Sequence, residues 1–225
     1  MKKIAIIVVC LFSAVVVCHS QGTFQNLDFE AANVSGYSPN FPIPAADAIP
    51  DWQASQGVVY DGLSGGGSLI AIIDSNPSFG TAPLDGNYSV YLFGGGVTPN
   101  LFSASISQTG GIPPGTESIQ LDASYFGAPF AVTVGGTTID MVPLHTFVHY
   151  TLWGGNVPAS LAGETETLTI TEPPPTGTPP SGVELDDISF SPNPITVTPE
   201  PSPLVLTAIG GILFGIYRRF AEKGK

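Results

Sequence analysis

The sequence predicts an all-β fold, an antiparallel β-sandwich, for the central part of the chain. Short runs rich in β-branched and aromatic residues alternate with turn-forming residues, and the 225 residues include 27 Gly and 22 Pro. Helix signals are nearly absent there. Residues 167–171 alternate Thr with Leu168 and Ile170, which is the period-two pattern of a strand with one buried face. About 170 residues are enough for one domain with its own core.

Predicted strands follow one another along this body, and together with the turns between them they indicate a sandwich. In chain order they are residues 57–60, 68–73, 88–93, 103–107, 118–122, 131–134, 147–150, 165–170 and 185–190. The Gly135-Gly136 pair predicts a tight hairpin turn after the strand that ends at Val134. The Pro-rich residues 173–182 predict a stiff, extended loop before the last strand.

Two segments of the body resemble the galactose-binding-like jelly roll. These are Asn26-Leu27-Asp28-Phe29-Glu30, followed by Pro50-Asp51-Trp52, and Leu185-Asp186-Asp187-Ile188-Ser189-Phe190 near the end. The resemblance implies a fold used by many bacterial carbohydrate-binding modules, in which the first and last strands lie side by side. It also implies a structural calcium ion, for which Glu30 and Asp187 are the expected ligands, although paired acids at strand ends are usually solvated polar faces.

The first residues have the pattern of a secretory signal peptide. Lys2 and Lys3 precede an apolar run at 4–17, and Cys18-His19-Ser20 is a tolerable cleavage site before Gln21. We therefore expect residues 1–20 to form a signal helix that is removed, and residues 21–190 to be an exported domain. Both cysteines lie in the signal, so the mature chain has no thiol or disulfide. Lipidation of Cys18 is disfavoured by the bulky residue before it.

The C-terminal end resembles the PEP-CTERM sorting signal of Gram-negative bacteria. It consists of Pro199-Glu200-Pro201, an apolar run at 204–217, and Arg218-Arg219. In that family an exosortase recognises and cuts the tail of proteins bound for the cell surface or its polysaccharide matrix. The resemblance implies a linker at 191–203, a transmembrane anchor at 204–217, and a basic cytoplasmic tail at 218–225, where the two arginines stop transfer.

The apolar run itself leaves an alternative to the anchor. Fourteen residues of helix span about 21 Å, which is short of a hydrocarbon core of ~30 Å, so residues 204–217 could also be a buried core helix. The flanking arginines can reach the interface, however, and an anchor that awaits cleavage need not span the membrane fully. We favour the membrane anchor.

The charge distribution excludes several functions. All six Lys and Arg lie at the two ends of the chain, and the span 21–199 has none. The same span holds every Asp and Glu except Glu200 and Glu222. Nucleic-acid binding and phosphate clamping are therefore excluded for the body, because both need basic side chains. The fold must depend on apolar burial and backbone hydrogen bonds, against the repulsion of its own charges.

The residues with possible binding chemistry are aromatic or histidine side chains. Trp52, Trp153, Tyr60 and Tyr125 are candidates for stacking on a sugar ring, although Trp residues in the contexts of Trp52 and Trp153 are more often part of the core. His145 and His149 would lie about 13 Å apart along a strand, too far to share one metal ion. Gly62-Leu63-Ser64-Gly65-Gly66 matches a nucleophile-elbow pattern, but a strand follows it instead of a helix, so we interpret it as a glycine loop.

These observations predict a non-catalytic β-sandwich at the cell surface or in the extracellular matrix, associated with exopolysaccharide. The alternative is a specific carbohydrate-binding module with a defined pocket. A glycoside hydrolase is less favoured, because no Lys or Arg is present to orient a substrate. An exposed aromatic platform beside acids would favour the binding module. Two carboxylates roughly 5–9.5 Å apart across a cleft would favour the enzyme.

Overall fold

The computed structural model describes residues 22–62, 69–75, 82–97, 100–127, 129–175 and 181–196. The predicted signal helix at 1–20, the sorting motif Pro199-Glu200-Pro201, the anchor at 204–217 and Arg218-Arg219 lie outside these residues. Internal contacts join residues 1–195 into one compact unit, and residues 196–225 form a second. Of the helices within the described residues, none has the length and apolar character needed to cross a membrane.

Nine strands form the larger of two sheets. In spatial order they are β1 (Phe41–Ile43), β3 (Val58–Tyr60), β4 (Leu69–Ile73), β5 (Ser89–Val97), β14 (Ser181–Ser191), β8 (Ser118–Phe126), β12 (Thr151–Asn156) and β11 (Val142–Thr146), with β6 (Asn100–Phe102) paired to β5. Strands β3 and β4 run parallel and the other pairs are antiparallel, so the sheet is mixed where a purely antiparallel one was expected.

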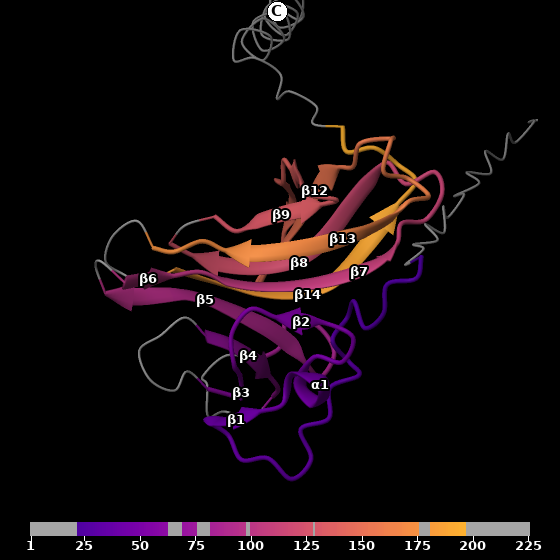
Figure 1. Cartoon of the computed structure of the whole chain (residues 1–225). Coiled ribbons are helices and arrows are strands. Elements are labelled where there is room, and N and C mark those ends of the chain that lie inside the picture. The colour runs from indigo at the N-terminus through magenta and orange to yellow at the C-terminus, as the bar shows by residue number, and fades with distance from the viewer. Residues whose placement is uncertain are drawn as a thin grey trace, which may run out of the picture. The chain divides into compact units, whose positions relative to one another are not determined.

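Five strands form the smaller sheet, which lies over the middle of the larger one (Figure 1). Their order is β10 (Thr137–Ile139), β9 (Ala131–Val134), β13 (Thr165–Glu172), β7 (Ala104–Gly111) and β2 (Gln53–Ala54). The predicted hairpin is confirmed, since Thr137 pairs with Val134. Gly135 and Gly136 between them both have positive φ, at 56° and 74°, a conformation that favours Gly.

The hydrophobic core fills the space between the two sheets. From β8 it takes alternate residues, Ile119, Leu121 and Ala123, and from β13 it takes Leu168 and Ile170. All five are at most 1% exposed. The threonines of β13 alternate with this pair, as the sequence pattern predicted, and the all-β sandwich is confirmed.

The N-terminal part of the body differs from the expectation. Residues 26–30 form turns rather than a strand, and Phe29 has a positive φ of 55°. The segment still lies beside the last strand, because the Ile188 N–H donates to the Leu27 carbonyl at 3.0 Å. The short helix α1 (Ala45–Ala48) follows, and in Figure 1 this indigo region lies below β5.

The strand predicted at residues 147–150 was wrong. These residues form the turn between β11 and β12, in which the Phe147 N–H donates to the Tyr150 carbonyl at 2.8 Å. Thr146 pairs with Thr151 on either side of the turn. The composition was typical of a strand, but pairing of the flanking residues leaves the aromatic residues at an exposed tip, where Val148 is 91% exposed.

Candidate functional site

The candidate site lies on the outer face of the larger sheet. Along β8, Gln120, Asp122 and Ser124 alternate with the core residues and so face away from the smaller sheet. Asp122 stands opposite Asp186 on β14 and opposite Leu152 on β12. The middle of β8 therefore has an apolar inner side and a polar outer side.

A pocket of about 410 Å³ opens on this outer side. Its lining combines two aromatic side chains with two carboxylates and two neutral polar groups. They are Phe147, Tyr150, Asp122, Asp187, Gln120 and Ser189. A second pocket of about 220 Å³ is lined by Ser124, Tyr125 and the hairpin tip, and it shares Phe147 and Tyr150 with the first. Both pockets border the hairpin tip, and we refer to the two together as the β8 groove.

The hairpin tip forms one wall of the β8 groove. The rings of Phe147 and Tyr150 lie 4.7 Å apart at 33°, and the His145 ring meets Phe147 edge-on at 4.5 Å. Phe147 is 44% exposed. His149 lies in the turn and His145 in β11, so the two are not on one strand as the sequence analysis assumed. Tyr150 is half-buried, so Phe147 is the ring of this pair that is open to stack on an apolar ligand face.

Three carboxylates influence the pocket. Burial, and then the charge of Asp187, raises the pKa of Asp122 to about 6, with a smaller contribution from Asp85, while a hydrogen bond with Tyr150 opposes the shift. Burial and the charges of the same three acids raise the pKa of Tyr150. Asp85, Asp122 and Asp187 therefore all act on the hydroxyl of Tyr150, and repulsion between them is built into the site.

Asp186 holds these groups in position. Its Oδ2 accepts hydrogen bonds from the Ser89 hydroxyl at 2.9 Å and the Asp85 N–H at 3.2 Å, and its Oδ1 accepts one from the Asp187 N–H at 2.8 Å. Burial raises the pKa of Asp186 to about 7 against the lowering effect of these bonds. The register of β14 shifts just after Asp186, and Asp187 has a positive φ of 47°.

The two expected calcium ligands have different environments. Both carboxylate oxygens of Glu30 accept hydrogen bonds, from the Asn87 N–H at 2.6 Å, the Asn87 side-chain amide at 2.7 Å and the Tyr88 N–H at 3.0 Å. Burial raises the pKa of Glu30, but these bonds outweigh it and the net shift is downward. Asp187 lines the pocket instead. No group of three or more His, Cys, Asp or Glu among the described residues is placed to hold a metal ion.

Two of the four predicted stacking residues are buried. Trp52 is 5% exposed, packs on Phe29 at 5.6 Å and donates from Nε1 to the Asn26 carbonyl at 2.9 Å. Tyr60 is 6% exposed and its hydroxyl donates to Asp74 at 2.6 Å. Neither ring has a face open for stacking.

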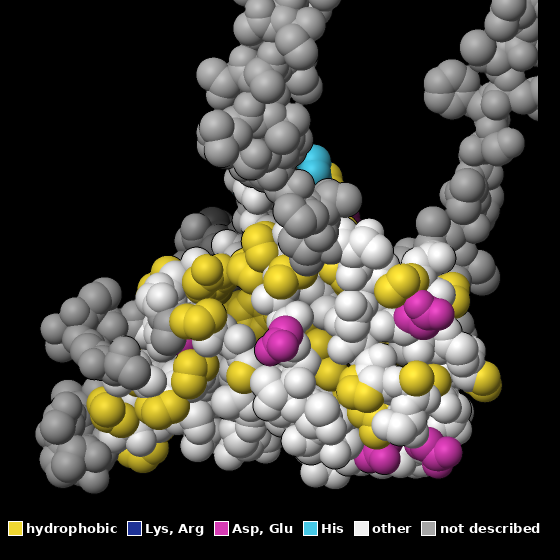
Figure 2. Space-filling model, turned by 90° about the horizontal axis from the view of Figure 1, so that it is seen from above, with side chains coloured by type: hydrophobic (Ala, Val, Ile, Leu, Met, Phe, Trp, Pro, Cys, Tyr) yellow, Lys and Arg dark blue, Asp and Glu magenta, His cyan; other side chains and the backbone are white. Residues whose placement is uncertain are grey.

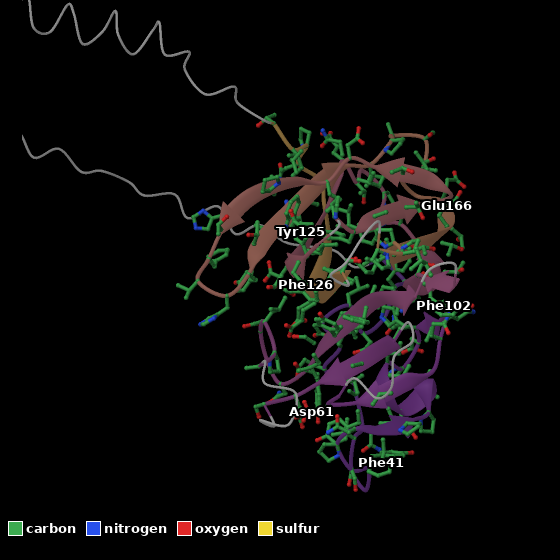
Figure 3. The ribbon with its side chains drawn as sticks, turned by 90° about the vertical axis from the view of Figure 1, so that its left-hand side faces the viewer. Phe41, Asp61, Phe102, Tyr125, Phe126 and Glu166 are labelled. Carbon is green, nitrogen blue, oxygen red and sulfur yellow. The ribbon has the colours of Figure 1, made fainter. Side chains whose placement is uncertain are left out.

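The other two lie in one aromatic cluster at the end of β8. Trp153 is half-buried and meets Tyr125 and Phe130 edge-on, each at 5.6 Å. Tyr125 is 42% exposed and belongs to the lining of the smaller pocket. Its neighbour Phe126 is 44% exposed on the opposite side of the strand, and Figure 3 labels both. Tyr125 is in phase with the core residues Leu121 and Ala123 and packs edge-on against Phe130, so its ring is on the inner side of β8.

Sequence reasoning missed Asp122, Phe147 and Tyr150. A signal for Asp122 was present, because the alternation of Ile119, Leu121 and Ala123 places the residues between them on the other face. No comparable signal marked the hairpin tip. The serine of the nucleophile-elbow pattern, Ser64, lies outside the described residues.

Comparison with known proteins finds distant structural likeness. No protein-family model matches the chain, and no curated protein does. The carbohydrate-binding module TmCBM61, solved in complex with β-1,4-galactotriose, is 18% identical with a TM-score of 0.44, over 76% of this chain and 98% of that one. A cyclase from Fischerella sp. in its apo form is 14% identical with a TM-score of 0.46, over 80% and 98%. A cyclase from Fischerella sp. TAU is 13% identical with a TM-score of 0.46, over 78% and 98%.

Proposed function

We propose that the domain is a non-catalytic carbohydrate-binding module that holds a polysaccharide chain in the β8 groove. The observation that carries the proposal is the pair of adjoining pockets that share Phe147 and Tyr150. A chain of sugar rings presents apolar faces and hydroxyl-rich edges in alternation. The groove offers aromatic rings for the first and carboxylates for the second. The proposal uses these side chains alone, because TM-scores below 0.5 carry no ligand from one structure to another.

The placement of the acids favours binding over hydrolysis. Asp122 and Asp187 lie on β8 and β14, which are neighbouring strands of one sheet, so they share one wall of the pocket. A glycoside hydrolase needs its two carboxylates on opposite sides of the scissile bond. The other residues of the pocket lining, Phe147 and Tyr150 among them, bring no further carboxylate.

One observation nevertheless favours hydrolysis as the second candidate. Asp122 has a pKa raised to about 6 next to another carboxylate, which is the pattern of a general acid paired with a base. Release of reducing ends from a bound polysaccharide, abolished by Asp122→Asn, would establish this activity. Intact polysaccharide after prolonged incubation would exclude it for that substrate.

We further propose that the domain works outside the cell, where exopolysaccharide is present and an exosortase handles the C-terminal tail. Support comes from the sequence: the signal-like residues 1–20, the Pro199-Glu200-Pro201 motif, the apolar run at 204–217 and Arg218-Arg219. Replacing Pro199-Glu200-Pro201 by three alanines should retain the full-length protein in the membrane fraction. Release of this variant at the normal rate would contradict the sorting proposal.

The binding proposal is tested by titrating the full-length protein with a panel of polysaccharides in a calorimeter. Phe147→Ala should weaken binding at least about tenfold, because it removes one ring of the wall. Phe41→Ala is the matched control, since Phe41 is 63% exposed on β1, at the opposite edge of the larger sheet from the hairpin. Figure 3 shows Phe41 far from Tyr125 and Phe126. Equal effects of the two substitutions would refute the groove as the binding site.

A further inference from the structure

The charge of the β8 groove distinguishes between classes of glycan. We propose that its larger pocket takes an amino sugar, with the ammonium group of a deacetylated hexosamine unit beside Asp122 and Asp187. This inference rests on the proposed function, because it names the class of polysaccharide for the same groove. It depends on three features: the convergent carboxylates, the absence of basic residues from the body, and the aromatic wall.

Two carboxylates, Asp122 and Asp187, line the pocket, and a third, Asp85, acts on Asp122 through its charge. Asp122 comes from β8, Asp187 from the shifted register of β14, and Asp85 from the loop before β5. Asp186 ties the last two together through the hydrogen bonds of their N–H groups. Asp122 is 6% exposed although it lines an open pocket. This nearly buried carboxylate lies in the field of two others, and the hydrogen bond with Tyr150 only partly offsets the rise of its pKa.

A cation gains more from this arrangement than a neutral hydroxyl does. A sugar hydroxyl donates one hydrogen bond and therefore satisfies one carboxylate. An ammonium group donates three hydrogen bonds and is attracted by all three acids at once. It would also relieve the repulsion that Asp187 and Asp85 exert on Asp122.

The rest of the body offers no counter-charge to these acids. The span 21–199 contains no Lys or Arg, and no dark blue side chain is seen in Figure 2 among the described residues. His149 lines the smaller pocket, and the His145 ring contacts Phe147 edge-on. A uronate or sulfated glycan would add negative charge where nothing can pair with it. The acidic glycans are therefore disfavoured, and neutral and cationic ones remain.

The aromatic wall suits a cationic sugar for a second reason. The faces of Phe147 and Tyr150 carry the negative part of the ring quadrupole, and both residues line the same pocket as Asp122 and Asp187. Such a face attracts a nearby ammonium group and also covers the apolar face of a sugar ring. Carboxylates and aromatic rings in one pocket match an amino sugar better than a neutral hexose.

The test compares three β-1,4-linked tetrasaccharides that differ at C2: one of glucosamine, one of N-acetylglucosamine and one of glucose. Each is titrated into the full-length protein by calorimetry at near-neutral pH and low salt. We expect the glucosamine form to bind at least about tenfold more tightly than the glucose form. This preference should shrink at high salt, because the attraction between charges is screened.

Asp187→Asn should remove most of the preference, because it lowers affinity for the glucosamine form by a larger factor than affinity for the glucose form. Asn tolerates the left-handed backbone that Asp187 occupies. Asp51→Asn is the matched control, since Asp51 is also exposed and has a positive φ of 70°. Thermal denaturation shows whether Asp187→Asn is folded. If it is not, Asp122→Asn removes the charge of the other pocket carboxylate and takes its place in the test.

The outcomes separate the two proposals. Equal binding of the three sugars would overturn the amino-sugar inference and leave the glycan-binding proposal standing. Binding of none of them would overturn the inference as well, and the polysaccharide panel would then decide the proposed function. A third outcome would also overturn the amino-sugar inference. If submillimolar calcium displaces the glucosamine form and Asp187→Asn retains the preference for it, the acids are assigned to a metal ion.

Discussion

The two faces of strand β8 share one backbone but carry side chains of opposite chemistry. Ile119, Leu121 and Ala123 face the smaller sheet and are at most 1% exposed. Between them, Asp122 faces outward and yet is buried, at only 6% exposed, and the neighbouring Asp186 is 2% exposed. Burial is therefore nearly equal on the two faces. What differs is its consequence: inside, burial removes apolar surface from water, and outside it confines charge that finds no basic partner.

This difference shows where stability and function separate in the molecule. A buried methyl group on the inner face needs nothing else, whereas a buried carboxylate on the outer face needs a proton, hydrogen bonds or a cation. Asp186 receives three hydrogen bonds from Ser89, Asp85 and Asp187. Asp122 opens instead to the pocket. The outer face is organised around charge that a ligand can complete.

Adjacent substitutions on β8 give the largest contrast. Leu121→Ala should lower the free energy of unfolding by about 2–5 kcal/mol, because it leaves a cavity between the sheets. Asp122→Asn should leave it unchanged or raise it above pH 6, because it removes a poorly compensated charge. Denaturant unfolding of the full-length protein measures both.

The same two variants should rank in the opposite order when glycan affinity per folded molecule is measured instead of stability. Leu121→Ala should retain affinity, and Asp122→Asn should weaken it, most of all for the glucosamine form. A large destabilisation by Asp122→Asn at pH 8 would contradict the division between the two faces of β8.

Asp186→Ala should have the next largest effect. It leaves the hydroxyl of Ser89 and the N–H groups of Asp85 and Asp187 without their acceptor, at a cost of about 1–3 kcal/mol. It should also weaken glycan binding, because two pocket acids lose their positions. Asp186→Asn keeps one acceptor oxygen and should recover part of both losses. Unchanged binding in the alanine variant would show that Asp186 does not position the site.

The inner face was predictable from the sequence and the outer face was not. Leu168 and Ile170 alternate with threonines, so the local pattern was enough to predict β13. The Gly135-Gly136 pair was likewise enough to predict the turn of the β9–β10 hairpin. The acids of the groove come from β8, β14 and the loop before β5, which only tertiary structure brings together. Asp122 and Asp187 are far apart in sequence, and no local spacing encodes their meeting.

Two aromatic segments show the same physical effect. Residues 147–150 have a strand-like composition but form a turn, because pairing of Thr146 with Thr151 determines the register. Trp52 was a candidate for stacking as well as for the core, and the turns at residues 26–30 bring Phe29 and the Asn26 carbonyl to its ring. In both cases long-range contacts decided what an aromatic residue does.

The pH dependence of stability should reveal the buried acids as a group. Burial raises the pKa of Asp186 and Glu172 to about 7 and that of Asp122 to about 6. The folded state therefore holds these protons more tightly than the unfolded state, where carboxylates titrate near pH ~4. Their stabilising effect is complete below the unfolded pKa and is lost as pH rises through 6 and 7.

Thermal unfolding should show a Tm that falls by at least about 5 °C between pH 5 and pH 8. Asp186→Asn should flatten the curve, because it removes one of the titrating groups. The lowered pKa of Glu30 acts in the opposite direction, but below this window. A Tm that rises from pH 5 to pH 8 would contradict the placement of these carboxyls.

The smallest expected effect concerns the charge of the whole body. With no Lys or Arg in the span 21–199, added salt can only screen repulsion there, so the Tm should rise by a few degrees at low to moderate ionic strength. A divalent cation should raise it further. Calcium compared with chelator at fixed ionic strength then separates screening from a bound ion. A rise abolished by Glu30→Gln or Asp187→Asn would indicate the calcium site that the jelly-roll resemblance implies, and an equal rise with magnesium would assign the effect to screening. A Tm independent of salt would show that repulsion does not limit this fold.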